Sequence, residues 1–150
     1  MPWAEAFLFQ ADRAQHFAEI ILPALAASKL VITDRCFDSS IAYQGVARGL
    51  GAQQIEQLSL LATQGHVPDL TILLDLDPNK VSQRTSQATR AEQSHFDRRE
   101  EAFHQQLRQA FLALAQQHPQ RIKVVDAAQS AEQIHQEIVN LVEQRLTSAT

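Results

Sequence analysis

The sequence contains one cysteine, four glycines and no long apolar run. A lone cysteine, Cys36, excludes a disulfide within the chain, and free thiols are typical of the reducing cytoplasm. No apolar run approaches the roughly 20 residues that a membrane-spanning helix needs, so we expect no membrane segment. The pattern G-x-x-x-x-G-K-S/T does not occur in the 150 residues. The sequence therefore lacks this backbone cradle for nucleotide phosphates.

The charge balance is acidic, with 13 Lys and Arg against 17 Asp and Glu and a net charge of −4. Proteins that bind nucleic acid or membrane surfaces usually carry an excess of basic residues, so we expect neither partner. The six histidines show no metal-ligand spacing, and we expect no metal site made by the chain alone. Length and an apolar content of 45% suit a single domain, residues 1–150.

Hydrophobic periodicity predicts helices that alternate with short apolar strands. The expected helices cover residues 4–28, 52–64, 77–90, 98–118 and 130–146, and the expected strands cover 30–33, 70–76 and 121–126. Pro23 is expected to kink the first helix or to mark a late turn in it. Residues 39–49 are expected to form a loop or an irregular helix. The alternation predicts an α/β fold with a parallel sheet and right-handed crossovers.

Polar side chains follow the first expected strand. Asp34 and Arg35 come directly after residues 30–33, and Ser40, Tyr43 and Gln44 follow. Ligands of open α/β sheets bind where strands end. Arginine suits phosphate capture, and the hydroxyl, phenol and amide groups can hydrogen-bond a sugar and a base. The same residues are also compatible with a helix cap, a surface ion pair and loop packing.

Four segments resemble, in the same order, those of thymidylate kinases, members of the P-loop nucleoside-monophosphate kinase group. They are FLFQADRAQH (7–16), VITDR (31–35), SSIAYQGVARG (39–49) and PDLTILLDL (68–76). The resemblance implies a P-loop NTPase-like three-layer sandwich with a parallel sheet. We expect the chain to correspond to the family's C-terminal two-thirds, without the family's first strands and phosphate loop.

The resemblance also implies a dTMP site. Phe9 would stack on the thymine ring, and Arg13, one helical turn further on, would hydrogen-bond the base. Ser40 would contact the base edge. Tyr43 would pack against the deoxyribose, and Gln44 would line the same pocket.

The implied reaction is transfer of the ATP γ-phosphoryl group to dTMP, giving dTDP for dTTP biosynthesis, with Mg²⁺. Arg35 would hold the dTMP phosphate, and Asp34 would order Mg²⁺ or its waters; these two are the expected catalytic residues. Arg84 would lie against the adenine in the family's lid. His95 replaces the lid arginine in a gapless alignment, whereas an alternative alignment over 97–100 keeps an arginine. The implied assembly is a cytoplasmic homodimer.

Three functions remain open from the sequence. The first is a working dTMP kinase whose front portion is supplied elsewhere. The second is a dTMP-binding protein without phosphoryl transfer, and the third is a structural or interaction fragment that binds no nucleotide. Because the phosphate loop pattern is absent, we expect no kinase activity and little stability for the isolated chain.

Overall fold

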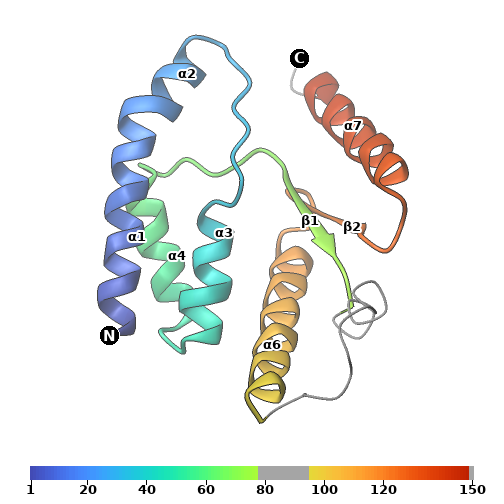
Figure 1. The fold of residues 1–150 in the computed structure, drawn as a ribbon. Helices are drawn as coiled ribbons and strands as arrows, with labels where there is room; N and C mark the ends of the chain where they lie inside the picture. The colour runs from blue at the N-terminus through green and yellow to red at the C-terminus, as the bar shows by residue number, and fades with distance from the viewer. Residues whose placement is uncertain (78–94, 149–150) are drawn as a thin grey trace. The chain divides into compact units, whose positions relative to one another are not determined.

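The computed structural model describes residues 1–77 and 95–148 (Figure 1). Most of the expected helix over 77–90 lies outside the described residues. The chain divides into two compact units, Met1–Val67 and Pro68–Thr150. The single-domain organisation of residues 1–150 stays a prediction.

The first unit begins with a nearly continuous helical stretch. It consists of α1 (Pro2–His16), the π-helix η1 (Phe17–Ile21) and α2 (Leu22–Ala26). Pro23 lies in the first turn of α2 and has no N–H to donate to the preceding turn, so the regular α-helical pattern is interrupted just before it. The stretch therefore agrees with the expected helix over 4–28 and with an irregularity near Pro23.

Three further helical elements complete this unit. They are α3 (Phe37–Ser40), the π-helix η2 (Ile41–Ala47) and α4 (Ala52–Ala62). The expected irregular helix over 39–49 is thus largely η2. Figure 1 shows α4 beside both α1 and α3, and these pairs are in contact. The core lies between them and includes the buried side chains Ala6, Phe17, Phe37, Ile41, Ala42 and Ile55.

The backbone of η2 comes close to α4 at Gly45. A Cβ atom added to Gly45 would lie 2.9 Å from Ala52 Cα and 3.3 Å from Gly51 O. Because both neighbours are backbone atoms, Gly45→Ala should lower the free energy of unfolding by about 1–3 kcal/mol, as expected for an overpacked core. Urea denaturation measures this loss.

The control for this substitution is Gly49→Asn. Nothing lies within 4 Å of the Cβ position of Gly49, and asparagine is among the residues that tolerate its φ of +71°. An equal fall in the free energy of unfolding in the two variants would contradict the close-contact explanation for Gly45.

The predicted strand over 30–33 is wrong. These residues belong to no strand of the sheet that the structure describes, and Leu30 and Ile32 are 64% and 87% exposed. A strand requires a neighbour that pairs with its backbone N–H and C=O groups. The described sheet pairs only β1 with β2. Without a paired neighbour, Leu30 and Ile32 lie outside regular secondary structure and are exposed.

The second unit contains a parallel pair of strands, β1 (Thr71–Asp75) and β2 (Ile122–Asp126). Thr71 pairs with Ile122, and the register continues to Asp75 with Asp126. Both strands lie within the ranges predicted from the sequence. Leu74 is 53% exposed, so the prediction of a strand covered on both faces is not met within this unit.

Two long helices accompany the strands, α6 (His95–Gln117) and α7 (Ala131–Ser148). Both contact β2. Ser130 precedes α7 and accepts a hydrogen bond on Oγ from the Gln133 backbone N–H at 3.2 Å, while its own N–H donates to Gln133 Oε1 at 3.1 Å. This reciprocal pair is a capping box, which explains why α7 begins there. None of the helices in the described part of the chain is long and apolar enough to cross a membrane.

Candidate functional site

The Arg13 guanidinium joins α3 to α1 and, through Gln10, is connected to α4 as well. Its Nη1 donates to Gln10 Oε1 at 2.7 Å, and its Nη2 donates to Ser40 Oγ on α3 at 2.9 Å. The amide of Gln10 is held in turn, because its Nε2 donates to Ser59 Oγ on α4 at 3.0 Å. One hydrogen-bonded chain therefore runs from α4 through α1 to α3 and fixes the orientation of the guanidinium.

Arg13 is half-buried, and this burial lowers its pKa below its ordinary value. Interactions with Cys36, Asp12 and Asp38 act in the opposite direction. A guanidinium stays charged throughout the neutral range despite such a shift. The site thus contains a permanently charged guanidinium, called the Arg13 fork below, whose N–H groups can donate to a ligand oxygen.

Phe9 lies one turn before Arg13 on α1 and is 49% exposed. Residues four apart share a helix face. An exposed ring beside a fixed donor suits a flat heteroaromatic ligand that also carries a carbonyl oxygen. The structure therefore places Phe9 and Arg13 one turn apart on α1 and joins Arg13 to Ser40 on α3. Their role as a ligand site stays a prediction.

Arg35 and Tyr43 form a second pair. The Arg35 guanidinium carbon lies 4.5 Å from the centre of the Tyr43 ring, and Arg35 Nε donates to Ser39 Oγ at 3.3 Å. Such cation–π contacts stabilise a guanidinium over an aromatic face. The backbone of Arg35 has a φ of +64°, which is uncommon for a residue with a side chain. Thr33 Oγ1 donates to the Arg35 carbonyl at 3.0 Å and supports this conformation.

The remaining predicted residues occupy different environments. Gln44 is buried, and its Nε2 donates to Glu5 Oε1 at 2.9 Å, which joins η2 to α1. Asp34 is exposed beside Arg35. Arg84 lies outside the described residues, and His95 begins α6 without a described side chain.

Sequence reasoning missed Gln10, Ser59 and Glu5. Gln10 and Arg13 are three residues apart on one helix, a spacing at which side chains meet, so a polar residue at position 10 was a usable signal. Ser59 and Glu5 offered none, because their partners lie 49 and 39 residues away in the chain.

An ion pair lies at the carboxyl end of β1. Asp75 accepts two hydrogen bonds from Arg108 on α6, at 2.7 Å from Nε and 2.9 Å from Nη2. Asp77 Oδ2 lies 3.6 Å from Arg108 Nη1. The hydrogen bonds from Arg108 lower the pKa of Asp75, although burial acts in the opposite direction. The pair joins the end of the strand to the helix.

We expect this pair to make stability depend on pH in the acidic range. A depressed folded-state pKa contributes stability above the unfolded pKa of about 3.9, and this contribution is lost as the pH falls through the lower folded value. Urea midpoints of the wild type and Asp75→Asn should therefore differ at pH 6 and converge towards pH 2. Asp69→Asn is the control, because Asp69 is 85% exposed and 3.9 Å from Arg145. A difference for Asp75→Asn that is independent of pH would contradict the assignment.

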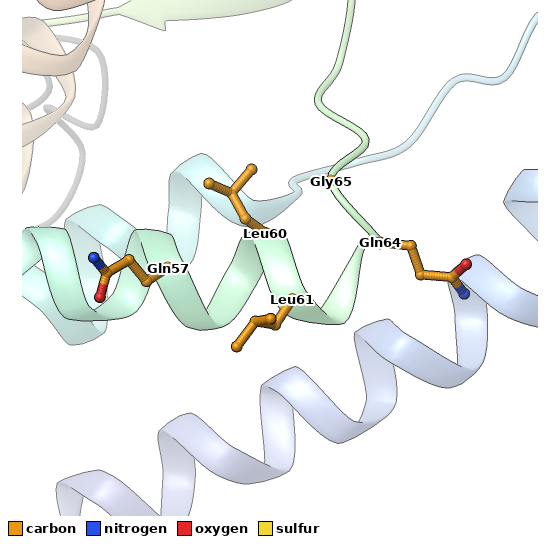
Figure 2. A pocket seen from close by; sticks show the side chains of 5 residues that line it. All are labelled: Gln57, Leu60, Leu61, Gln64 and Gly65. Atoms are coloured by element: carbon orange, nitrogen blue, oxygen red, sulfur yellow. The ribbon is translucent and has the colours of Figure 1, made fainter.

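A shallow hollow lies along the second half of α4 and the turn after it. It is lined by Gln57, Leu60, Leu61, Gln64 and Gly65, which Figure 2 shows as sticks. None of the residues predicted to bind a ligand is among them. Leu61 is 76% exposed, so this is an open surface and not the site built around Arg13.

Whether titratable residues could bind a metal ion depends on how they cluster in the part of the chain that the structure describes. Residues 1–77 and 95–148 contain no group of three or more His, Cys, Asp or Glu that could hold one. Mg²⁺ is usually bound by one or two carboxylates together with substrate phosphates and water. The exposed Asp34 carboxylate fits such a contribution and does not make a metal site by itself.

Comparison with known proteins identifies the family. The family model described as "Thymidylate kinase" matches residues 1–138. The thymidylate kinase of Latilactobacillus sakei subsp. sakei is 46% identical over 140 residues, which are 93% of this chain and 65% of that protein. The thymidylate kinase of Acaryochloris marina is 47% identical over 146 residues, which are 95% of this chain and 63% of that protein.

A solved structure is also similar. The crystal structure of thymidylate kinase from Ehrlichia chaffeensis has a TM-score of 0.71 and 29% identity, and the match covers 95% of this chain and 65% of that one. The likeness confirms the predicted α/β, P-loop NTPase-like fold class. The chain spans about two thirds of the length of these relatives. On the family match and the relatives together, the chain belongs to the thymidylate kinase family.

Proposed function

We propose that this chain binds dTMP and takes part in the transfer of the ATP γ-phosphoryl group to it, giving dTDP. The observation that carries the proposal is the Arg13 guanidinium, which Gln10 and Ser40 hold in place one helical turn after the exposed Phe9 ring. A thymine base offers a flat face for the ring and carbonyl oxygens for the fork. Family membership supports the same reaction.

This arrangement supports the proposed base and sugar roles. Phe9 stacks on thymine, and Arg13 donates to a carbonyl of the base. Ser40, whose hydroxyl accepts from Arg13, contacts the base edge. Tyr43 packs against the deoxyribose. Gln44 supports this pocket from its buried position, through its hydrogen bond to Glu5.

Arg35 is the proposed ligand of the dTMP phosphate. Its exposed guanidinium lies over the Tyr43 ring, and a dTMP phosphate at this place would receive charge-assisted hydrogen bonds. Asp34 is the carboxylate that would hold Mg²⁺ or its waters. Bound Mg²⁺ supplies neutralisation of the negative charge on the phosphoryl groups. The roles of Arg84 and His95 towards ATP stay predictions.

A second candidate is dTMP binding without phosphoryl transfer by this chain. One observation favours it, namely that G-x-x-x-x-G-K-S/T does not occur in the 150 residues. Incubation with ATP, Mg²⁺ and dTMP distinguishes the two candidates. Formation of dTDP by the purified chain would reject the second one.

We also propose that the chain forms homodimers and acts in the cytoplasm. Exposed apolar side chains gather on α1 and η1, where Trp3, Phe7, Leu8 and Ile20 are between 42% and 72% exposed. Such a surface suits burial against a second copy. Sedimentation velocity measures the assembly, and a monomer at all concentrations would reject the dimer. The cytoplasmic location rests on the single cysteine.

The first test of the proposal is a thermal melt with and without millimolar dTMP, with dGMP as the control. A ligand that binds only the folded state raises the melting temperature. We expect a rise with dTMP that dGMP does not produce, because the proposed site takes a pyrimidine and guanine is a larger, two-ring base. No rise with dTMP, or the same rise with dGMP, would overturn the proposal.

A further inference from the structure

We propose that Gln10 is a positioning residue that sets the preference of this site for thymine over cytosine. The inference rests on the proposed function, because it assigns Gln10 a role through Arg13 at the base end of the dTMP site. Gln10 has no predicted contact with the ligand. It acts by holding the guanidinium that makes the contact.

The Gln10 amide is fixed at both ends. The side chain is 7% exposed, so water cannot readily replace either of its partners. Its NH₂ group donates to Ser59, which is fully buried on α4, and its oxygen therefore faces Arg13. A serine held in the core of one helix thus determines, through Gln10, where the Arg13 guanidinium lies.

Arg13 needs such support, because an arginine side chain has many rotamers and loses entropy when it is held in one of them. Gln10 occupies Nη1 and Ser40 occupies Nη2, so both arms of the fork are anchored on different elements. Loss of the Gln10 anchor would release Nη1, and the guanidinium would then be held by Ser40 and by its interactions with Cys36 and Asp38. The guanidinium could then turn away from the ligand.

The consequence for the ligand is a matter of donor and acceptor chemistry. Thymine carries a carbonyl oxygen at the ring position where cytosine carries an amino group. A fixed guanidinium donates to the carbonyl but faces N–H groups of the amine, to which it cannot donate. A guanidinium that can turn away discriminates less. The preference for dTMP over dCMP therefore reports on the fixation of Arg13.

The experiment measures dissociation constants of dTMP and dCMP by calorimetry for the wild type, Gln10→Met and Gln10→Glu. Methionine keeps the length of the side chain but removes the strong acceptor, and we expect the dTMP:dCMP preference to fall about fivefold to tenfold, as for one lost hydrogen bond. Glutamate keeps an oxygen for Arg13 and can accept from the Ser59 hydroxyl. We expect it to restore the preference.

Two further variants keep the test decisive. Ser59→Ala removes the anchor of Gln10 and should lower the preference in the same direction, so it carries the test if Gln10→Met does not fold. The variant that combines Gln10→Met with Ser59→Ala should lose no more of the dTMP:dCMP preference than Gln10→Met alone, because both changes break the same chain of hydrogen bonds. Gln53→Met, at an exposed glutamine on α4, is the matched control and should leave the preference unchanged.

The outcomes separate the two proposals. If the wild type does not bind dTMP, the proposed function fails and with it the basis for Gln10. If the wild type prefers dTMP and Gln10→Met keeps that preference, the role of Gln10 is overturned. Equal weakening of dTMP and dCMP in Gln10→Met would also overturn it, since a merely structural residue affects both ligands alike.

Discussion

Arg13→Met is expected to weaken the binding of dTMP and of thymidine alike, by about 1.5–3 kcal/mol, the range for hydrogen bonds to charged groups. Both ligands carry the base, and the proposed contact of Arg13 is with the base. The same substitution leaves Gln10 Oε1 without its donor in a buried position. The free energy of unfolding should therefore fall by about 1–3 kcal/mol as well.

Titration calorimetry and urea denaturation on the same preparations separate these two effects. Arg13→Lys is the matched variant, because it keeps the charge but cannot present a planar fork to Gln10 and Ser40 together. We expect it to recover part of the stability and little of the affinity. Unchanged thymidine binding in Arg13→Met would contradict the assignment of Arg13 to the base.

The sequence predicted most helices and strands correctly because their burial repeats along the chain. Ile55 and Ser59 are both fully buried on α4, at the four-residue spacing that marks one helix face. Leu107, Ala110 and Leu114 form the same pattern on α6. Such periodicity arises within a segment, so it can be recognised without knowing what lies opposite.

The error at 30–33 has the opposite origin. Leu30 and Ile32 have the composition of a strand, but a strand is a property of two segments. The sequence does not show whether a second segment pairs with the first. The covering of a strand is equally non-local, and Val124 on β2 is 44% exposed although its neighbour Val125 is fully buried.

In the candidate site too, some residues could be predicted from the sequence and others could not. The resemblance to a known family predicted one site for Phe9, Arg13 and Ser40, and the structure joins Arg13 on α1 to Ser40 on α3, with Phe9 one turn before Arg13. Ser59 could not be predicted, because its hydroxyl meets Gln10 only through the packing of α4 against α1. Residues that hold a ligand-binding side chain in place without contacting the ligand carry no motif of their own.

Arg35→Ala is expected to weaken dTMP binding by about 2 kcal/mol, or roughly 30-fold, as for the loss of a charge-assisted hydrogen bond to phosphate. The affinity for thymidine should not change, because thymidine has no phosphate. This difference distinguishes Arg35 from Arg13, whose substitution should weaken both ligands. Stability should change little, because Arg35 is exposed and its hydrogen bond to Ser39 is 3.3 Å long.

Lys29→Ala provides the control for Arg35, because it removes one positive charge from an exposed side chain of the same unit. If general electrostatic attraction held the phosphate, both substitutions would weaken dTMP binding alike, and added salt would weaken it further. A direct contact predicts that Arg35→Ala alone causes the loss, and that Arg35→Lys recovers part of it as a point charge without the fork. Unchanged dTMP affinity in Arg35→Ala would remove Arg35 from the site.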